Sequence, residues 1–578
     1  MITPAKAAPN ATSESSTEPM TLETFFKKFE LFADAPDAVA RMRQVILSSA
    51  VKGELVTQDP KDESATQLLK EIEKKRSELV LEKKAKLELK PHRSAKSDPP
   101  PWNPPGWEWR RFNDVIWCFR GHNPPKSEFI SEPREGYLRF VQITDFKTDS
   151  RAVYVRESPK NKLVFKGEII MAAYRHIGKL SRSMEGAFNV ALCKVMEIPP
   201  MSRDFVELLI GTDLVKGELL AASGRAHIPS MHSAHLLSLW VPIPPLAEQK
   251  RIVAKVDELM ALCDRLEAQQ QERNTLHADL ARASLARFAE APTPANLNLL
   301  FHKSYTIPPA DLRKSILTLA VQGKLVPQDP NDEPAKQNLS LIKAAKDQLQ
   351  KSGAIAKEKK IAPLDSETLP FDLPESWCWE KLATVTELIT KGSSPKWQGV
   401  AYVSENEGVL FITSENVGNY NLRKLDQLKY VENKFNEIEP RSILKHGDIL
   451  MNLVGASIGR TAIYNLRECA NINQAVALIR LVRETDGVCP RFLLHYFNSP
   501  SAIDYMLSSR VTSAQPNISL TNARDFAIPL PPLAEQSRIV AKVDQLMALV
   551  DQLETQLTTS RATAKNLLEA LVAELTTQ

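Results

Sequence analysis

The chain contains a long internal repeat, and this repeat constrains its fold more than any other feature. Residues 243–270 and 530–557 are identical at 21 of 28 positions, at an offset of 287 residues. Upstream, residues 43–65 and 313–335 share 14 of 23 positions, at an offset of 270. Repetition at this level identifies a tandem duplication, in which each copy is one structural unit.

The stretches between the repeated segments have diverged. Residues 116–235 and 386–522 are hard to align, although similar sequence flanks both. The two offsets differ by 17, so the second copy carries a net 17 extra residues between Val385 and Leu530. The duplication therefore predicts a scaffold that stayed alike and two inserts that did not.

The repeated P-P-L-A-E-Q segment predicts a helix with a narrow apolar seam. Proline is tolerated in the first helical turn, and glutamate there suits the positive end of the helix dipole. Apolar residues then recur at a 4-3-4-3 spacing, which is typical of helices that pair with other helices. Two such seams favour mutual antiparallel packing or docking to a second protein, and the alternative is an amphipathic helix on a domain surface. The residues expected to serve this pairing or docking are Ile252, Val256, Leu259, Leu266, Ile539, Val543, Leu546, Val550 and Leu553.

Each insert reads as a compact domain of mixed α/β structure. A W-x-W pair opens each one, at 107–109 and 377–379, and we expect these tryptophans to anchor its core. Short runs typical of strands follow, and a helical stretch is expected at 490–499. The expected strand runs are 137–143, 162–173 and 190–196 in the first insert, and 409–413, 448–454 and 475–482 in the second.

Proline-rich and lysine-rich linkers mark the expected boundaries between domains. The expected division is a disordered leader at 1–20, a helical scaffold region at 21–103, a first recognition domain at 104–242, a central scaffold and spacer at 243–372, a second recognition domain at 373–529 and a scaffold helix at 530–578.

Composition narrows the class of protein without deciding its function. A net charge of +4 permits DNA binding but does not demonstrate it. No apolar run reaches the ~20 residues of a membrane helix, and residues 1–20 lack the apolar core of a signal peptide. The six cysteines form no C-x-x-C pair, which argues against a zinc ribbon or a disulfide framework and fits a reducing cytoplasm. The ten histidines show no H-x-x-x-H or H-E pair, so no metal site is expected.

The loops of both inserts carry side chains suited to nucleic-acid contact. Asn and Gln can read adenine, Arg and Lys can read guanine, and Lys, Ser and backbone N–H groups can hold phosphates. The alternative for each residue is an ordinary solvated polar side chain. The candidates for DNA binding are Tyr174, Arg175, His176, Lys179 and Arg182 in the first insert, and Ser414, Asn416, Asn452, Ser457, Arg460, Gln515 and Asn517 in the second.

Motifs that would indicate catalysis are incomplete. The N-P-P sequences at 103–105 and 123–125 resemble the loop of amino-methyltransferases, but neither has the aromatic residue that stacks on a flipped base. The stretch GASIGRT at 455–461 resembles a phosphate loop but has three residues between its glycines, where four are needed, and arginine where lysine is needed. We interpret it as a tight turn between strands, and we predict no catalytic centre.

With these features assembled, the sequence resembles the specificity subunits of Type I restriction–modification systems. The marks that carry the resemblance are the doubled P-P-L-A-E-Q-x-R-I-V-A-K-V-D segment, the stretch A-V-Q-G-K-L-V-P-Q-D-P-N-D-E-P-A at 320–335 with its twin at 50–65, and the W-x-W entries. The first insert departs from the common pattern at 223–240, where Arg225, His227, His232 and His235 replace a polar run rich in serine and asparagine.

The resemblance implies a fold and a function. The implied fold is two α/β target-recognition domains of mixed α+β type on a duplicated long-helix scaffold, which pairs as an antiparallel coiled coil. Each domain is expected to read one half of a bipartite, asymmetric site in double-stranded DNA. The helices are expected to set the spacing between the two half-sites and to dock two modification subunits. S-adenosylmethionine, ATP and Mg are expected on the modification and restriction/translocase subunits, and no cofactor on this chain. Two alternatives remain: a coiled-coil adaptor with protein-binding α/β modules, and a fused methyltransferase or nuclease.

Overall fold

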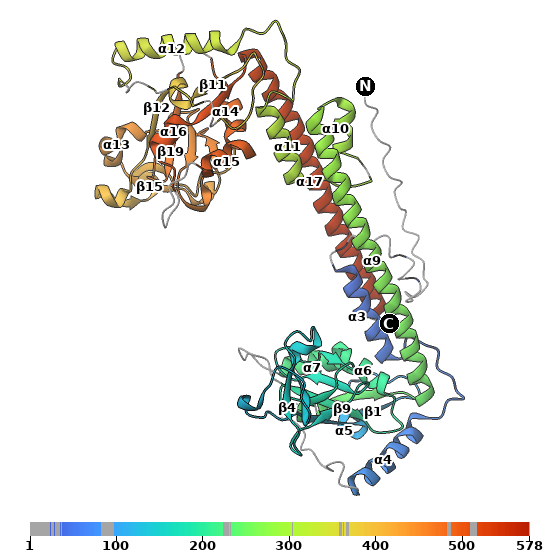
Figure 1. The fold of residues 1–578 in the computed structure, drawn as a ribbon. Helices are drawn as coiled ribbons and strands as arrows, with labels where there is room; N and C mark the ends of the chain where they lie inside the picture. The colour runs from blue at the N-terminus through green and yellow to red at the C-terminus, as the bar shows by residue number, and fades with distance from the viewer. Residues whose placement is uncertain are drawn as a thin grey trace. The chain divides into compact units, whose positions relative to one another are not determined.

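A computed structural model describes most of the chain and divides it into two compact units. One unit comprises residues 1–272 and 559–578, and the other comprises residues 273–558 (Figure 1). The described residues are Thr24, Lys28, Ala35, 37–81, 98–222, 231, 233–302, 304–357, 361, 363–365, 369–482, 487–508 and 517–576, so the expected leader at 1–20 lies outside them.

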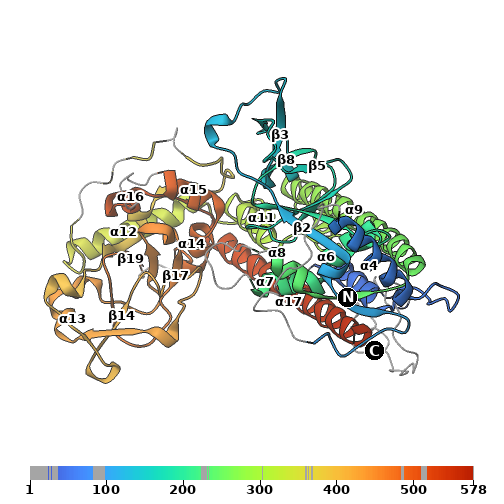
Figure 2. The same ribbon diagram turned by 90° about the horizontal axis from the view of Figure 1, so that it is seen from below.

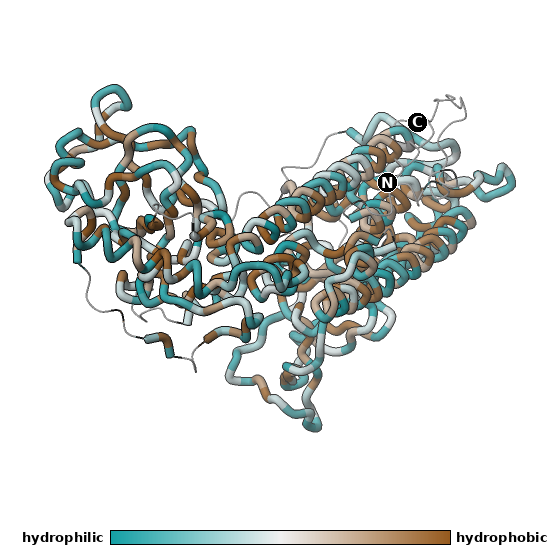
Figure 3. The backbone as a smooth tube through the Cα atoms, turned by 90° about the horizontal axis from the view of Figure 1, so that it is seen from above, coloured by the Kyte–Doolittle hydropathy of each residue, from teal (hydrophilic) through white to brown (hydrophobic). Residues whose placement is uncertain are grey.

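Two long helices each contribute to both units. Helix α9 (Leu246–Glu290) has 45 residues and α17 (Leu533–Thr576) has 44. At 1.5 Å per residue, each is about 66–68 Å long, well beyond the repeated segment from which we expected them. Apolar residues recur along both as interrupted brown bands (Figure 3). Among the described residues, no helix combines the length and the apolar character that a membrane span requires.

The first unit places an α/β domain against short scaffold helices. The scaffold contributes α3 (Ala38–Lys52) and α4 (Ala65–Leu81), and α3 ends at Gly53, whose φ of 76° is a left-handed conformation that glycine adopts without strain. The helices of the domain are α5 (Phe112–Val115), α6 (Arg203–Gly211), α7 (Asp213–Ala222) and α8 (Ser233–Ser238). Its strands are β1 (Glu108–Arg111), β2 (Ile116–Arg120), β3 (Tyr137–Val141), β4 (Val153–Arg156), β5 (Leu163–Val164), β6 (Ile169–Ala172), β7 (Leu180–Ser181), β8 (Gly186–Phe188), β9 (Leu192–Glu197) and β10 (Trp240–Ile243).

The second unit repeats this plan. Its scaffold helices are α10 (Pro294–Leu300), α11 (Pro309–Val321), which is followed by Gly323 at a φ of 69°, and α12 (Ala335–Lys351). The helices of its domain are α13 (Lys434–Ile438), α14 (Pro490–Phe497), α15 (Pro500–Ser508) and α16 (Leu520–Asp525). Its strands are β11 (Cys378–Lys381), β12 (Thr386–Lys391), β13 (Tyr402–Val403), β14 (Gly408–Ile412), β15 (Lys429–Glu432), β16 (Ile449–Asn452), β17 (Thr461–Ile463), β18 (Ala470–Ile472), β19 (Val476–Leu481) and β20 (Ala527–Leu530).

The sheets of the two domains correspond strand for strand, with one exception. Each domain has a four-stranded sheet of the same order, β2-β9-β6-β7 and β12-β19-β16-β17. In the other sheet, β4-β3-β8 corresponds to β15-β14-β18, and β3–β8 and β14–β18 are the matching parallel pairs. The fourth strand joins opposite edges, because β5 pairs with β8 whereas β13 pairs with β15. Figure 2 shows β3, β5 and β8 grouped in the first domain.

The structure locates the 17 extra residues of the second copy. Equivalent backbone positions are separated by 270 residues at the start of each domain and by 287 at its last helices. Nine of the extra residues enter between β14 and β16, since the offset is 271 at Val141 and Ile412 but 280 at Ile169 and Ile449. In the first domain this segment contains β5, whereas in the second domain the fourth strand, β13, precedes β14.

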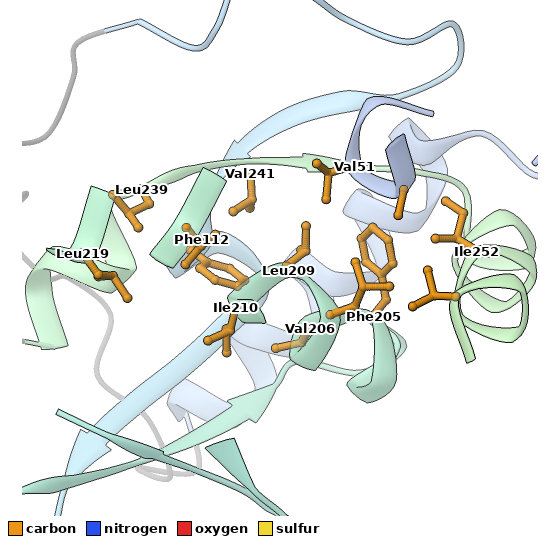
Figure 4. Close-up of a cluster of buried hydrophobic side chains, with 14 of the residues drawn as sticks. Val51, Phe112, Phe205, Val206, Leu209, Ile210, Leu219, Leu239, Val241 and Ile252 are labelled. Atoms are coloured by element: carbon orange, nitrogen blue, oxygen red, sulfur yellow. The ribbon is translucent and has the colours of Figure 1, made fainter. Parts of the chain in front are cut away.

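Of the tryptophans predicted to anchor each core, the first of each pair does so, whereas Trp379 is only partly buried. Trp107 and Trp377 are 2% and 4% exposed. In the first unit, Phe205, Val206 and Leu209 of α6 point into the same cluster as Phe112 of α5 (Figure 4). Each core therefore joins the domain to its own scaffold helices.

Most residues of the predicted seams are buried, with Leu266 and Leu553 partly exposed, and the two seams belong to different cores. The seam of α9 belongs to the core of the first unit, together with α3, α6 and the last turns of α17 at Leu568 and Leu571. The seam of α17 belongs to the core of the second unit, together with α11, α14 and Ala281 and Phe288 near the end of α9. Mutual packing of the two seams was therefore the wrong prediction. Each seam begins its own helix and meets the end of the other.

Candidate nucleic-acid interface

Two hairpins of the same construction carry many of the predicted DNA-binding residues. In β6–β7, Ala172 N donates to Lys179 O at 2.8 Å and Gly178 N donates to Ala172 O at 3.1 Å. In β16–β17, Asn452 N donates to Arg460 O at 2.9 Å and Gly459 N donates to Asn452 O at 3.1 Å. Lys179 and Arg460 therefore occupy equivalent positions. The GASIGRT stretch lies in this second hairpin, as the interpretation of a tight turn predicted.

Each hairpin is tied to loops from elsewhere in its domain. Ala173 N donates to Ala191 O at 2.8 Å, and Met231 N donates to Ala173 O at 2.9 Å. In the second domain, Leu453 makes the two matching bonds, each 2.9 Å, with Ala475 O and Ile518 N. One end of each domain thus gathers the hairpin, the link between two strands and the segment that leads to α8 or α16.

A glycine brings the turn after β2 or β12 to the same end of the domain. A Cβ on Gly121 would lie 2.0 Å from Phe188 O, and a Cβ on Gly392 would lie 1.7 Å from Ile472 O. No side chain fits at such distances, so only glycine allows this approach. The loops gathered at this end of each domain are called the hairpin end below.

The hairpin tip of the first domain presents exposed polar and aromatic side chains. Tyr174, Arg175, His176 and Lys179 are all exposed. Arg175 adopts a φ of 60°, which is uncommon for a residue with a side chain, and its guanidinium carbon lies 6.0 Å from the centre of the Tyr174 ring. These four predicted residues lie together.

Arg182 does not join them. Its Nη1 donates to Asp204 at 2.6 Å and to Glu207 at 3.2 Å, both on α6, and its Nε donates to Gly167 O at 3.2 Å. The Asp204 and Glu207 carboxylates raise the pKa of the guanidinium. Two carboxylates neutralise the charge of Arg182, so the prediction that it contacts DNA was wrong. Its side chain instead attaches the hairpin to α6.

Two asparagines predicted to contact DNA are buried in the second domain. Asn452 is 0% exposed and donates from Nδ2 to Ser414 O at 2.9 Å. Asn416 is 2% exposed, and its Oδ1 accepts from the amide and the hydroxyl of Thr413 at 3.0 and 2.9 Å. A buried amide offers no edge to a base, so we correct both residues to positioning roles beneath the loops.

The remaining candidates of the second domain lie nearer the surface. Arg460 and Ser457 are partly exposed in the hairpin, and the Ser457 hydroxyl donates to Val454 O at 3.3 Å. Asn517 is partly exposed and forms an isolated bridge with Val454. Ser414 is partly exposed. Gln515 lies outside the described residues.

The unusual stretch before β10 is described only in part. His235 is 4% exposed within α8, so it packs in the core. Arg225, His227 and His232 lie outside the described residues.

A cavity of about 980 Å³ lies beside the second hairpin, among α11, α14, α15 and α17. His495 on its wall is 2% exposed, and burial lowers the pKa of its imidazole to about 4. Its Nδ1 lies 3.3 Å from the Tyr420 hydroxyl, and its Nε2 lies 3.7 Å from Asp544 Oδ1. The imidazole is therefore neutral near pH 7, and the equivalent position of the first unit holds Leu208.

Within the parts of the chain that the structure describes, no cluster of three or more histidine, cysteine, aspartate or glutamate side chains is arranged to hold a metal ion.

The structural correspondence of the two hairpins also has a signal in the sequence, which is missed when each loop is considered separately. The stretches M-A-A-Y-R-H-I-G-K and M-N-L-V-G-A-S-I-G-R share their methionine, their I-G pair and their final cation.

Comparison with known proteins decides the family. The model of the Type I restriction modification DNA specificity domain matches residues 104–275 and again residues 379–560. Together these matches span more than half of the chain and include both hairpins.

The chain belongs to this family. It is a specificity subunit of a Type I restriction–modification system with two DNA specificity domains, so its role is DNA recognition rather than catalysis. The adaptor alternative is not favoured.

Curated relatives of this specificity subunit match it over nearly its whole length. It is 28% identical to the specificity subunit of the Type I restriction enzyme EcoEI of Escherichia coli, covering 92% of this chain and 93% of the relative. Identity to the EcoAI specificity subunit of Escherichia coli is also 28%, with the same coverage. Among solved structures, an HsdS subunit from Thermoanaerobacter tengcongensis is 21% identical, with a TM-score of 0.43 over 83% of this chain and 99% of that one.

Proposed function

We propose that each domain of this specificity subunit reads one half of a bipartite, asymmetric site in double-stranded DNA through its hairpin end. The observation that carries the proposal is the equivalence of Lys179 and Arg460. Both cations end a hairpin of the same backbone construction, and neither has an ion-pair partner among the described residues. A shared frame with unlike tips is what two readers of different half-sites require.

The chemistry of the tips supports unlike half-sites. The first presents Tyr174, Arg175 and His176, whereas the second presents a glycine, an alanine and Ser457 between its strands. Arginine and lysine suit guanine edges and phosphates, and small residues allow close approach of the backbone. We propose Tyr174, Arg175, His176, Lys179, Ser457 and Arg460 as DNA contacts, together with Ser414, Gln515 and Asn517.

The long helices are proposed to pair antiparallel as a coiled coil and to set the spacing between the half-sites. They are also proposed to dock two modification subunits. The support is that the start of each helix shares a core with the end of the other, at Ile252 with Leu568 and at Ile539 with Phe288. S-adenosylmethionine, ATP and Mg are proposed to bind the modification and restriction/translocase subunits, and the assembly is proposed to act in the cytoplasm.

Selection from a randomised duplex pool tests the proposal. The chain, assembled with its modification subunit, is mixed with the pool, and retained duplexes are sequenced. We expect enrichment of two short sequences at a fixed separation. Each should change independently when one hairpin tip, 173–178 or 453–459, is replaced by glycine and serine. A complex that prefers no duplex over random DNA contradicts the proposal.

A further inference from the structure

An exposed tryptophan lies on the turn that follows β12. Trp397 belongs to the 3₁₀ turn Pro395–Gln398 and is 73% exposed. Among the described residues, no aromatic ring or cation stacks on its indole. A large aromatic side chain that stays in water on a surface loop offers its whole apolar face to a binding partner.

The turn itself is rigid. Pro395 is buried and its carbonyl accepts from Val400 N at 2.9 Å. The Gln398 side chain donates from Nε2 to Ser393 Oγ and to Glu439 Oε1, each at 2.9 Å. The backbone thus fixes where Trp397 projects, and a fixed aromatic loses little conformational entropy when it binds.

The turn starts at the hairpin end of the second domain. Gly392, five residues before Trp397, approaches Ile472 O, and the next residue of that strand link is Asn473. The Asn473 side chain accepts from Ala475 N at 3.1 Å, and Ala475 O accepts from Leu453 N of the hairpin. The turn and the hairpin therefore belong to one framework.

The first domain also has a 3₁₀ turn after its equivalent strand, but the turn begins two residues later from the glycine. Gly121 approaches Phe188 O as Gly392 approaches Ile472 O, and a 3₁₀ turn at Lys126–Glu128 follows. Counting from these glycines, the position of Trp397 is held by Lys126. Lys126 is the first residue of its turn, whereas Trp397 is the third residue of its own, and the turn of the first domain contains no tryptophan.

The sequence of the turn favours DNA over a basic protein. Lys391 and Lys396 are exposed and both precede Trp397, and the stretch from Leu388 to Ser404 contains no acidic residue. The carboxylates that reach this segment, Glu439 and Glu432, accept hydrogen bonds from Gln398 and Ala401. A positive potential attracts the phosphate backbone and brings the indole to the bases between the strands.

We infer that Trp397 is a base-contacting residue of the second recognition domain, where its indole meets base edges or a thymine methyl group and contributes to the choice of that half-site. The inference rests on the proposed function. Lys396 contacts a phosphate beside it and contributes affinity without sequence preference.

The test compares Trp397→Ala, Trp397→Phe and Lys396→Ala in the full chain assembled with its modification subunit. The probes are the duplex selected by the wild-type complex and the same duplex with the second half-site scrambled. Trp397→Ala should weaken binding to the selected duplex about tenfold while leaving the scrambled one unchanged. Trp397→Phe should retain most of the preference, and Lys396→Ala should weaken both alike and reduce the salt dependence.

Three results would overturn the inference. One is a Trp397→Ala complex that keeps the wild-type preference. Another is an equal loss on both duplexes, which assigns the indole to the backbone. The third is failure of Trp397→Ala to assemble with the modification subunit in gel filtration while its thermal unfolding is unchanged, which assigns the surface to a protein. If the wild-type complex selects no duplex, the proposed function fails, and this inference fails with it.

Discussion

The indole Nε1 of Trp377 donates a hydrogen bond of 2.9 Å to Oε2 of Glu535, and both side chains are buried. Trp377 lies at the start of the second recognition domain and Glu535 lies in the first turn of α17, so this bond joins the recognition domain to the scaffold. Burial raises the pKa of the Glu535 carboxyl, an effect that the bond from Trp377 opposes. Trp107 and Glu248 repeat the contact at 3.1 Å in the first unit.

Removal of this bond should destabilise the unit that contains it. Trp377→Phe keeps the apolar ring but leaves the carboxylate one donor short, and we expect a cost of about 2 kcal/mol. Urea unfolding followed by circular dichroism measures it, with Trp107→Phe as the matching change in the first unit. Trp397→Phe is the control, because that indole is exposed and should leave stability unchanged.

The hairpin cations should act on separate half-sites. Loss of a contact to a base typically costs about 1–3 kcal/mol, so Lys179→Ala and Arg460→Ala should each weaken binding about tenfold or more. Scrambling one half-site at a time in a gel-shift competition shows which half each variant no longer reads. Equal losses on every duplex would assign both cations to phosphates instead.

Arg182→Ala should leave base preference intact, in contrast to Lys179→Ala on the same hairpin. Its ion pairs with α6 are partly exposed, and exposed pairs contribute about 0–1 kcal/mol. Thermal unfolding should therefore shift only slightly. A half-site preference altered as strongly as by Lys179→Ala would restore Arg182 to the DNA contacts.

His495 should make the second unit sensitive to acid. The folded chain holds its pKa at about 4, below the ordinary value near 6.5, so the unfolded chain takes up the proton first as the pH falls. The stability that the neutral imidazole provides is present above pH 6.5 and is lost as the pH falls toward 4. Between pH 7 and pH 5 this amounts to about 2 kcal/mol.

His495→Leu tests this sensitivity, because Leu208 holds the equivalent position in the first unit. Denaturant unfolding of the variant should depend less on pH between 7 and 5 than that of the wild type. An unchanged pH dependence would mean that the imidazole is not held neutral by burial.

A charge placed in either seam should disrupt the core of the corresponding unit. Leu546 is 1% exposed and Leu259 is 7% exposed, so Leu546→Glu or Leu259→Glu buries a carboxylate with no designed partner. Such changes commonly cost more than about 3 kcal/mol. Circular dichroism and gel filtration with the modification subunit should show partial unfolding and lost assembly. Leu549→Glu is the control, because Leu549 is 40% exposed on the same helix.

Sequence reasoning predicted the architecture well because duplication and periodicity are local signals. The strand predicted at 137–143 is found at 137–141, the helix predicted at 490–499 is found at 490–497, and Trp107 and Trp377 are buried as predicted. Placement of the seams failed for a geometric reason. Identical seams suggested mutual contact, but each begins its helix, and the start of one long helix meets the end of the other.

The candidate contacts separated according to burial, which the sequence did not reveal. Asn452 ends β16 and Arg460 precedes β17 in one hairpin, yet Asn452 donates inward to Ser414 O whereas Arg460 is partly exposed. Arg182 looked like a third loop cation until α6 supplied its carboxylates. Long-range partners of this kind depend on tertiary packing, whereas residue type alone supports only a list of candidates.

The two-stranded sheet at the base of each domain has an evolutionary consequence. Strand β1 pairs with β10, and β11 pairs with β20. The chain therefore leaves each recognition domain beside the point where it enters that domain. All residues between the paired strands are connected to the scaffold through this two-stranded sheet, and the sheet is built alike in both domains. A recombination event with both ends in these two-stranded sheets would replace one recognition domain with another at the same attachment to the scaffold. Inheritance of new target sites could then proceed by exchange of whole cassettes rather than by gradual substitution.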